Sequence, residues 1–283
     1  MSQAVAKNSG AGNKVVGGTA GARVRTRTVA LPVEHGGWGL TLEPVVLGML
    51  VAPTLAGLLL SVATLGAFLA RHPFKIIVVD RRHGRRFPRT PVAERYAALY
   101  AITAAAGLLL AVTFADGYAF LLPLLLAAPL AAVQLFYDAK GDSRALWPEL
   151  AGATALGGVA TSIALAGGLP EAPAYGLWAI LVARAVPAIL YVRARLDRLH
   201  GKRASTETVI ATHLIALALA AALARAGAVP VLAAAALLIL LSRAIHGLAE
   251  RRPGVTAKRI GVREIAYGAL TVALVAAGHG LGK

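Results

Sequence analysis

The chain of 283 residues contains no cysteine, and only 15% of its residues are charged. The absence of cysteine excludes disulfides, thiolate metal sites and cysteine nucleophiles. Soluble domains carry about 25% charged residues, so this scarcity of charge excludes an ordinary soluble domain. Together with apolar runs of about 20 residues, it predicts an all-α, polytopic membrane protein with the lipid bilayer as its surroundings.

Acidic residues are also scarce, with 13 Asp and Glu against 29 Lys and Arg and a net charge of +16. Such a charge raises the question of nucleic-acid binding. However, the basic residues gather in alternate segments between apolar runs, as topology signals do, and not along one soluble face. No RNP-like or zinc-knuckle pattern accompanies them, so we predict no nucleic-acid partner.

Nine membrane-crossing helices are predicted from the apolar runs. They cover residues 38–53, 55–70, 95–114, 118–136, 148–168, 174–192, 207–224, 229–247 and 264–280. The first two are short and share a turn at Pro53, which suggests a helical hairpin. In the fifth, Ala153, Gly157 and Thr161 recur at four-residue spacing, which predicts a face that neighbouring helices approach closely.

The distribution of Lys and Arg predicts the orientation of these helices. Segments that alternate along the chain hold 25 of the 29 Lys and Arg residues, namely 1–37, 71–95, 137–147, 193–206 and 248–263. By the positive-inside rule, the amino terminus lies in the cytoplasm and the carboxyl terminus lies outside. Residues 1–30 are polar and lack the apolar core of a signal peptide, so we expect a disordered cytoplasmic tail before a single transmembrane domain over 31–283.

Two basic segments repeat each other. Residues 80–86 read Asp-Arg-Arg-His-Gly-Arg-Arg, and residues 197–203 read Asp-Arg-Leu-His-Gly-Lys-Arg. Their corresponding places suggest an internal duplication, with halves over about 31–136 and 148–280. Basic segments of this kind usually act as topology signals that contact anionic lipid. The alternative is a phosphate or diphosphate site, because Arg binds phosphate bidentately, and the shared His-Gly favours this alternative.

On the second interpretation, the two basic segments form opposite walls of one ligand site that faces the cytoplasm. The candidate residues of the first wall are Asp80, Arg81, His83, Arg85 and Arg86, and those of the second wall are Asp197, Arg198, His200, Lys202 and Arg203. Glu43 and Arg184 are predicted to line the cavity between the walls. Further candidates at the cytoplasmic ends of the spans are Glu34, His35, Arg71, Lys75, Tyr191 and Arg193.

Charges inside the predicted spans need partners. An unpaired Arg184 near the middle of its span would cost about 3 kcal/mol, and Glu43 is the best-placed intramembrane partner. Glu43 therefore has two interpretations, a structural ion pair or a role in ligand binding or proton handling. Arg243 lies near a span end and is expected to extend to the interface, whereas His213 is expected to be a satisfied core histidine.

Metal sites receive little support from the sequence. The segment over residues 137–144 has as many acids as bases and is interpreted as a solvated turn. Five histidines, at positions 35, 72, 83, 200 and 246, lie near the cytoplasmic boundary without the paired spacing of a metal or haem site. No Ser-His-Asp order, Walker loop or dinucleotide fingerprint is present.

Several motifs together resemble the YwiC-like family of bacterial membrane proteins. They are Glu34-His35-Gly36-Gly37-Trp38 with Glu43-Pro44, the stretch from Pro73-Phe74-Lys75 through Asp80 to Pro88-Arg89-Thr90, Pro148-Glu149-Leu150-Ala151-Gly152, Tyr191-Val192-Arg193-Ala194-Arg195-Leu196, and Ile260-Gly261-Val262-Arg263-Glu264. The resemblance extends over about residues 31–280. It implies the bacterial cytoplasmic (inner) membrane, and the family brings no established activity.

The layout also resembles the UbiA superfamily of intramembrane prenyltransferases, whose nine helices carry Asp-rich motifs after the second and sixth. There the motifs hold a prenyl diphosphate through Mg²⁺. Asp80 and Asp197 stand at matching places, but His83 and Phe87 replace the other aspartates of the first motif. Two carboxylates among many cations are weak magnesium ligands, so the basic residues would neutralise the diphosphate directly.

These observations predict an integral membrane protein that binds an isoprenoid or lipid (di)phosphate at a basic cytoplasmic site. If the protein is an enzyme, transfer of a prenyl or similar lipid group is the reaction implied by the second resemblance. The alternative is a membrane transporter or a structural membrane component, because duplicated halves and buried charge also suit transporters.

Overall fold

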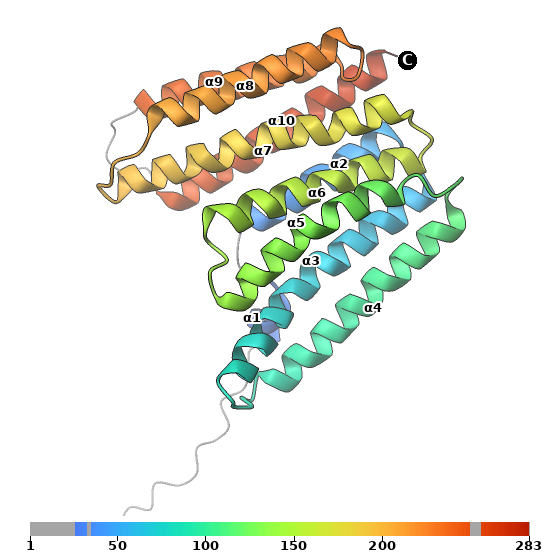
Figure 1. Cartoon of the computed structure of the whole chain (residues 1–283), viewed down its shortest axis with the longest axis vertical. Coiled ribbons are helices and arrows are strands. Elements are labelled where there is room, and N and C mark those ends of the chain that lie inside the picture. Colours follow the sequence, from blue (N-terminus) through green and yellow to red (C-terminus); the bar gives the residue numbers. More distant parts are fainter. Residues whose placement is uncertain (1–25, 33–34, 250–255, 283) are drawn as a thin grey trace, which may run out of the picture.

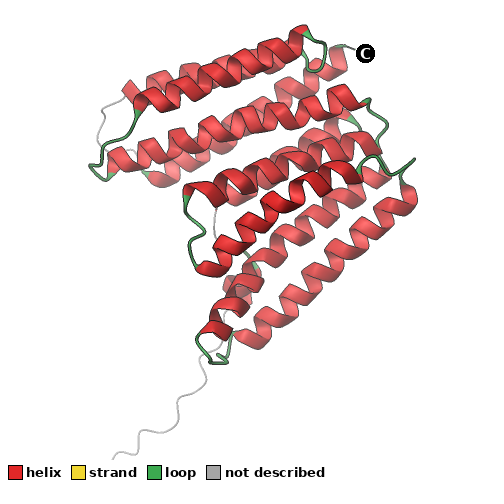
Figure 2. Cartoon of the chain, viewed as in Figure 1, coloured by secondary structure: helices red, strands yellow, loops and turns green. Residues whose placement is uncertain are grey.

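The computed structural model describes residues 26–32, 35–249 and 256–282, and this part of the chain is almost wholly helical (Figure 2). The helices are α1 Thr26–Ala30, α2 His35–Val51, α3 Leu55–Arg82, α4 Thr90–Phe114, α5 Leu121–Lys140, α6 Leu146–Ala166, α7 Glu171–Leu199, α8 Thr206–Arg225, α9 Val231–Ala249 and α10 Ala257–Leu281. No strand occurs among these residues. The predicted all-α class is confirmed.

Eight of these helices, α3 to α10, are long and apolar enough to cross a membrane, and α2 is a shorter apolar helix. Each of the nine predicted spans falls on one helix, so the chain is a polytopic helical bundle. In Figure 1, the turns after α3, α5 and α7 lie at one end of the bundle together with α1. This end carries the segments that were predicted to be cytoplasmic.

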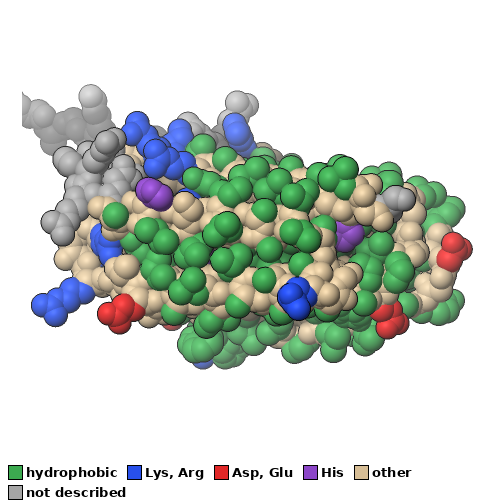
Figure 3. Space-filling view, turned by 90° about the horizontal axis from the view of Figure 1, so that it is seen from above, with side chains coloured by type: hydrophobic (Ala, Val, Ile, Leu, Met, Phe, Trp, Pro, Cys, Tyr) green, Lys and Arg blue, Asp and Glu red, His purple; other side chains and the backbone are tan. Residues whose placement is uncertain are grey.

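The surface over α8 and α9 also has charged side chains concentrated at one end. Hydrophobic side chains cover the middle of this face, and Lys and Arg side chains gather toward its left end (Figure 3). An apolar band between polar ends is the surface that a lipid bilayer stabilises.

Two predicted segments differ from the structure. The stretch over residues 71–95 was expected to be a loop, but α3 continues to Arg82 and α4 begins at Thr90. A helix of 28 residues is about 42 Å long at 1.5 Å per residue, so α3 extends well beyond a hydrocarbon core of about 30 Å. The expected tail over residues 1–30 also ends earlier, because Val29 and Ala30 of α1 are buried; residues 1–25 lie outside the described residues.

The bundle is organised around α6, which contacts α2, α3, α5 and α7. Its predicted small-residue face is confirmed, because Ala153, Gly157 and Thr161 are buried. A side chain at Gly157 would meet the indole of Trp178 at 2.7 Å, and the indole nitrogen donates to the Thr154 carbonyl at 2.7 Å. Helix α2 packs more extensively on α6 and α10 than on α3, so the expected α2–α3 hairpin is a minor contact.

Candidate functional site

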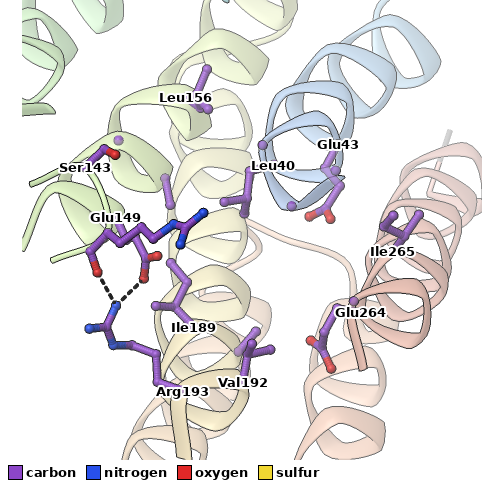
Figure 4. A pocket seen from close by; sticks show the side chains of 18 of the residues that line it. Leu40, Glu43, Ser143, Glu149, Leu156, Ile189, Val192, Arg193, Glu264 and Ile265 are labelled. Atoms are coloured by element: carbon purple, nitrogen blue, oxygen red, sulfur yellow. Dashed lines mark hydrogen bonds and ion pairs between the residues drawn. The ribbon is translucent and has the colours of Figure 1, made fainter. Parts of the chain in front are cut away.

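A cavity of about 620 Å³ lies between α2, α6, α7 and α10, and side chains from α3 and α5 also reach it. Its walls combine apolar side chains with charged ones, and Figure 4 shows several of them around the opening between the helices. Arg144 and His200 line the cavity and are exposed, so it opens at the end of the bundle that carries the basic turns. Leu40, Glu43 and Arg184 line its deeper part.

The deep part of the cavity contains an ion pair. The Nη2 of Arg184, on α7, lies 3.0 Å from the Oε1 of Glu43, on α2, and both side chains are about nine-tenths buried. The same Nη2 donates to the Glu264 carbonyl of α10 at 2.9 Å. The predicted pairing of Glu43 with Arg184 is therefore confirmed, and it joins three helices.

A second buried ion pair lies beside the first. Arg243 of α9 donates from Nη1 to the Oε1 of Glu264 at 2.9 Å, and its guanidinium carbon lies 4.1 Å from the centre of the Tyr191 ring. The side chain of Arg243 is only 5% exposed, so the expectation that it extends to the interface is wrong. Burial against Tyr191 and Glu264 replaces the contact with water, because the guanidinium gains an ion pair and a cation–π contact.

His213, on α8, lies in the core as expected, but only one of its two ring nitrogens has a hydrogen-bond partner among the described residues, so the expectation of a satisfied histidine is only partly confirmed. Its ring is buried, and the Nδ1 lies 2.7 Å from the Val209 carbonyl one turn earlier. The Nε2 has no hydrogen-bond partner among the described residues.

The mouth of the cavity is built from two further ion pairs. Arg193 donates from Nη1 to the Oε2 of Glu149 at 2.7 Å and to the Arg144 carbonyl at 3.0 Å (Figure 4). Arg71 pairs with Asp138, with 3.0 Å between Nη2 and Oδ1. Arg71 and Arg193 thus line the cavity with much of their charge already neutralised.

Lys75 lies near this mouth but does not line it. Its ammonium donates to the Ser143 hydroxyl at 2.7 Å, and this hydroxyl belongs to a lining residue. Asp138 and Ser143 belong to the segment over 137–144 that the sequence predicted as a solvated turn. Residues 141–145 do form a turn between α5 and α6, with Asp142 and Arg144 exposed, while Asp138 and Ser143 also hold cations of α3 at the rim.

The first basic segment does not reach the cavity. Asp80 is fully buried and accepts hydrogen bonds from the Arg89 Nη2 at 2.6 Å and from the Thr90 hydroxyl at 2.7 Å. These bonds hold the turn from α3 to α4, and the hydrogen bond to Asp80 raises the pKa of the Arg89 guanidinium. Arg81 and Arg86 lie near Glu94, at 4.0 and 2.7 Å, on the exposed surface.

The second basic segment reaches the cavity in part. Asp197 and His200 line it, whereas Arg198 donates to the Leu248 carbonyl and the Thr206 hydroxyl and so ties α7 to α9 and α8. Lys202 and Arg203 are exposed and do not line it. The structure therefore does not bring the two basic segments together as opposite walls of this cavity.

The repeated His-Gly pair has a local structural cause. His83 and His200 directly follow the last residues of α3 and α7, and each Nδ1 lies 2.7 Å from the carbonyl four residues earlier. Gly84 and Gly201 follow with φ of +62° and +72°. Glycine adopts this left-handed conformation without a steric penalty, which makes it the usual residue after a helix end.

A shared magnesium site at Asp80 and Asp197 does not fit this geometry. Both oxygens of Asp80 are engaged by Arg89 or Thr90, and Asp80 is not among the residues that line the cavity with Asp197. Among the described residues, no group of three or more His, Asp or Glu side chains is placed to hold a metal ion.

The remaining predicted candidates are divided between the site and other places. Glu34 lies outside the described residues, as does the side chain of His35. Tyr191 stacks on Arg243 and does not line the cavity, and Arg85 is an exposed residue outside it. Three residues of the site, Arg144, Glu149 and Glu264, were not predicted from the sequence, although Glu149 and Glu264 lie in the motifs that carry the family resemblance.

Comparison with known proteins agrees with that resemblance. Residues 31–164 match the sequence model of a family described as YwiC-like protein. No curated protein and no solved structure matches the chain. The matched residues include Glu43, Arg71, Asp80 and Glu149, so the family pattern covers the first basic segment and part of the cavity wall. The chain is thus similar to the YwiC-like family over residues 31–164, a little less than half of its length.

Proposed function

We propose that this integral membrane protein binds an isoprenoid or lipid that carries a phosphate or diphosphate head group. The ligand occupies the cavity between α2, α6, α7 and α10, in the bacterial cytoplasmic membrane. The observation that supports this proposal best is that one cavity joins an apolar wall to an exposed arginine at its mouth. An amphiphile needs both features in one site.

Arg144 is the residue that we expect to contact the phosphate. It lines the mouth, and no described side chain pairs with its guanidinium. The guanidinium therefore offers its donors to a phosphate, which it binds bidentately. Arg193 and Arg71 stand beside it but share their charge with Glu149 and Asp138. The basic turns around this end attract anions to the mouth.

The apolar part of the ligand fits the wall between the mouth and the deep ion pair. Ile189 and Val192 of α7 supply this wall, and Figure 4 shows both between Arg193 of the mouth and Glu43. The volume of about 620 Å³ lies within the range of about 300–1,000 Å³ that is usual for small-molecule sites. We therefore propose a site that binds its ligand without a magnesium cluster. The proposal covers binding, whether or not a reaction follows.

The test is thermal unfolding of the detergent-purified protein with and without a long-chain prenyl diphosphate, in magnesium and in EDTA. Ligand at 100 times its Kd adds about 2.7 kcal/mol, which corresponds to a rise of about 5 °C in Tm. We expect this rise in both buffers. A rise that requires magnesium would contradict a metal-independent site, and no rise in either buffer would overturn the proposal.

Arg144→Gln is the variant that locates the phosphate, with Arg85→Gln as its matched control. Both arginines are exposed and follow a helix end, but only Arg144 lines the cavity. We expect Arg144→Gln to weaken binding about tenfold, because one charge-assisted hydrogen bond contributes about 1.5–3 kcal/mol. Equal weakening by both variants would indicate a diffuse electrostatic effect and not this site.

Transport is the second candidate function, and the buried ion pairs are the observation that favours it. Glu43, Arg184, Arg243 and Glu264 place charge between membrane helices, where polar groups usually mark a pathway. Solute flux into proteoliposomes that is lost in Glu43→Gln and retained in Arg144→Gln would support transport over lipid-phosphate binding.

A further inference from the structure

The deep end of the cavity has a charge balance that differs from its mouth. Two carboxylates, Glu43 and Glu264, face two guanidiniums, Arg184 and Arg243, and all four side chains are at least 87% buried. The cluster is therefore neutral as a whole. A charged ligand group placed beside it would remain uncompensated in a medium of low dielectric constant, which is costly. The deep end thus suits an uncharged polar group.

The cluster also has hydrogen-bonding capacity that the protein does not use. Glu43 lines the cavity, and its only partner among the described residues is the Nη2 of Arg184. A carboxylate accepts about four hydrogen bonds, so Glu43 retains acceptor capacity toward the cavity. The Nε of Arg184 is buried without a partner among the described residues. The Glu43 carboxylate is thus the group at the deep end that offers a hydrogen-bond acceptor to a ligand donor.

A hydroxyl group matches both of these requirements, because it is uncharged and both donates and accepts. On α7, Arg184 lies nine residues before Arg193 of the mouth, which is about 14 Å along the helix. Ala188, Ile189 and Val192 line the cavity between them. A ligand that reaches both ends is therefore polar at each end and apolar in the middle.

We infer that the deep end of this cavity binds a hydroxyl group carried at the far end of the ligand from its phosphate. The inference rests on the proposed function, since the mouth must hold the phosphate. The hydroxyl donates to Glu43, while the side chains of α7 between the two ends contact the apolar chain. The ligand class is thus a phosphate amphiphile with a terminal hydroxyl.

Two matched probes test this inference, dodecyl phosphate and 12-hydroxydodecyl phosphate. Their affinities for the detergent-purified full chain are measured by thermal shift titration. A hydroxyl normally weakens the binding of an alkyl chain to an apolar site, because its hydration is lost. We expect the hydroxylated probe to bind about tenfold more tightly, since a hydrogen bond to a charged group contributes about 1.5–3 kcal/mol.

Gly39→Ala is the variant that blocks the deep end without removing a charge. The added methyl group would lie 3.5 Å from the Ile265 Cγ1 and 3.8 Å from the Glu43 Oε1, which are ordinary contacts. We expect it to abolish the preference for the hydroxylated probe and to leave dodecyl phosphate binding within about twofold. Gly280→Ala on α10, where no atom lies within 4 Å of the added methyl group, is the control and keeps the preference.

A double variant, Glu43→Leu with Arg184→Met, provides a second route to the same result. Replacing both members of a buried ion pair with apolar side chains is often neutral for stability, and here it removes the acceptor for the hydroxyl. We expect it to bind the hydroxylated probe no more tightly than dodecyl phosphate, because a hydroxyl in an apolar site loses its hydration without gaining a partner. A preference that survives in both Gly39→Ala and this double variant would place the hydroxyl elsewhere and overturn the inference.

The two proposals fail in different ways. If wild-type protein binds neither probe, the proposed function itself is contradicted. If it binds both with equal affinity, the phosphate site stands and the deep hydroxyl site is contradicted.

Discussion

The carboxyl-terminal ends of α3 and α7 have nearly the same sequence and the same local structure, yet they have different surroundings. Each is followed by a histidine, whose ring forms a hydrogen bond with the last turn of the helix, and then by a glycine with positive φ. At α3 the aspartate is buried in the turn to α4, whereas at α7 the aspartate lines the cavity. The comparison shows that the motif specifies how a helix ends, while the packing around it decides what its charges do.

Substitution of the two aspartates, Asp80 and Asp197, should give the largest difference in the free energy of unfolding. Asp80→Asn should reduce the free energy of unfolding by about 2–3 kcal/mol, because a buried acceptor for Arg89 and Thr90 is replaced by a neutral amide. Arg89 is half exposed, which keeps the loss below the about 3–5 kcal/mol that breaking a fully buried pair costs. Asp197→Asn should change it by about 0.5 kcal/mol or less. Unfolding of both variants in detergent measures the difference, and equal losses would contradict the comparison.

The two arginines that follow these aspartates should show the opposite asymmetry. Arg198 donates to the Leu248 carbonyl and the Thr206 hydroxyl, so Arg198→Ala should cost about 1–2 kcal/mol. Arg81 is 74% exposed and lies 4.0 Å from Glu94, so Arg81→Ala should cost about 0.5 kcal/mol or less. The same unfolding assay applies. A larger loss at Arg81 than at Arg198 would show that the surroundings of the two helix ends are misassigned.

The two glycines should behave alike, because they belong to the part of the motif that is local. Gly84→Ala and Gly201→Ala should each cost about 1–2 kcal/mol, since the left-handed conformation is strained for alanine and no atom lies within 4 Å of either added methyl group. Gly280→Ala, in a helix, is the control without this strain. Costs for Gly84 and Gly201 that differ by more than about 1 kcal/mol would indicate that packing contributes at one of them.

What the sequence predicted follows the same division between local and long-range physics. Helices of the bundle were predicted from apolar runs, because crossing a bilayer sets both their length and their composition. The pairing of Glu43 with Arg184 was predicted because a buried charge needs a partner. The continuation of α3 to Arg82 was not predicted, because the charged stretch after residue 70 was interpreted as a loop. A helix can extend beyond the bilayer into water, so charge alone does not mark its end.

The parts of the site that were not predicted depend on which helices are neighbours. Arg243 was expected to reach the interface because it lies near the end of its predicted span. The packing of α9 on α10 instead places Glu264 beside it as a partner. Likewise, the residues of 80–86 and 197–203 are too similar to predict that only the second segment reaches the cavity. The place of α7 between α6 and α8 decides this, and it is set by contacts far apart in the sequence.

The two histidines provide the smallest expected effect on stability and the sharpest test of function. Each ring makes one exposed hydrogen bond to its own helix, so His83→Ala and His200→Ala should each cost about 0.5 kcal/mol or less. Only His200 lines the cavity. We therefore expect His200→Ala to weaken dodecyl phosphate binding by about two- to fivefold, a loss of about 0.4–1 kcal/mol, while His83→Ala leaves it unchanged. If both histidines affect binding equally, the two helix ends act together on the ligand, and the division between a structural end and a cavity end is contradicted.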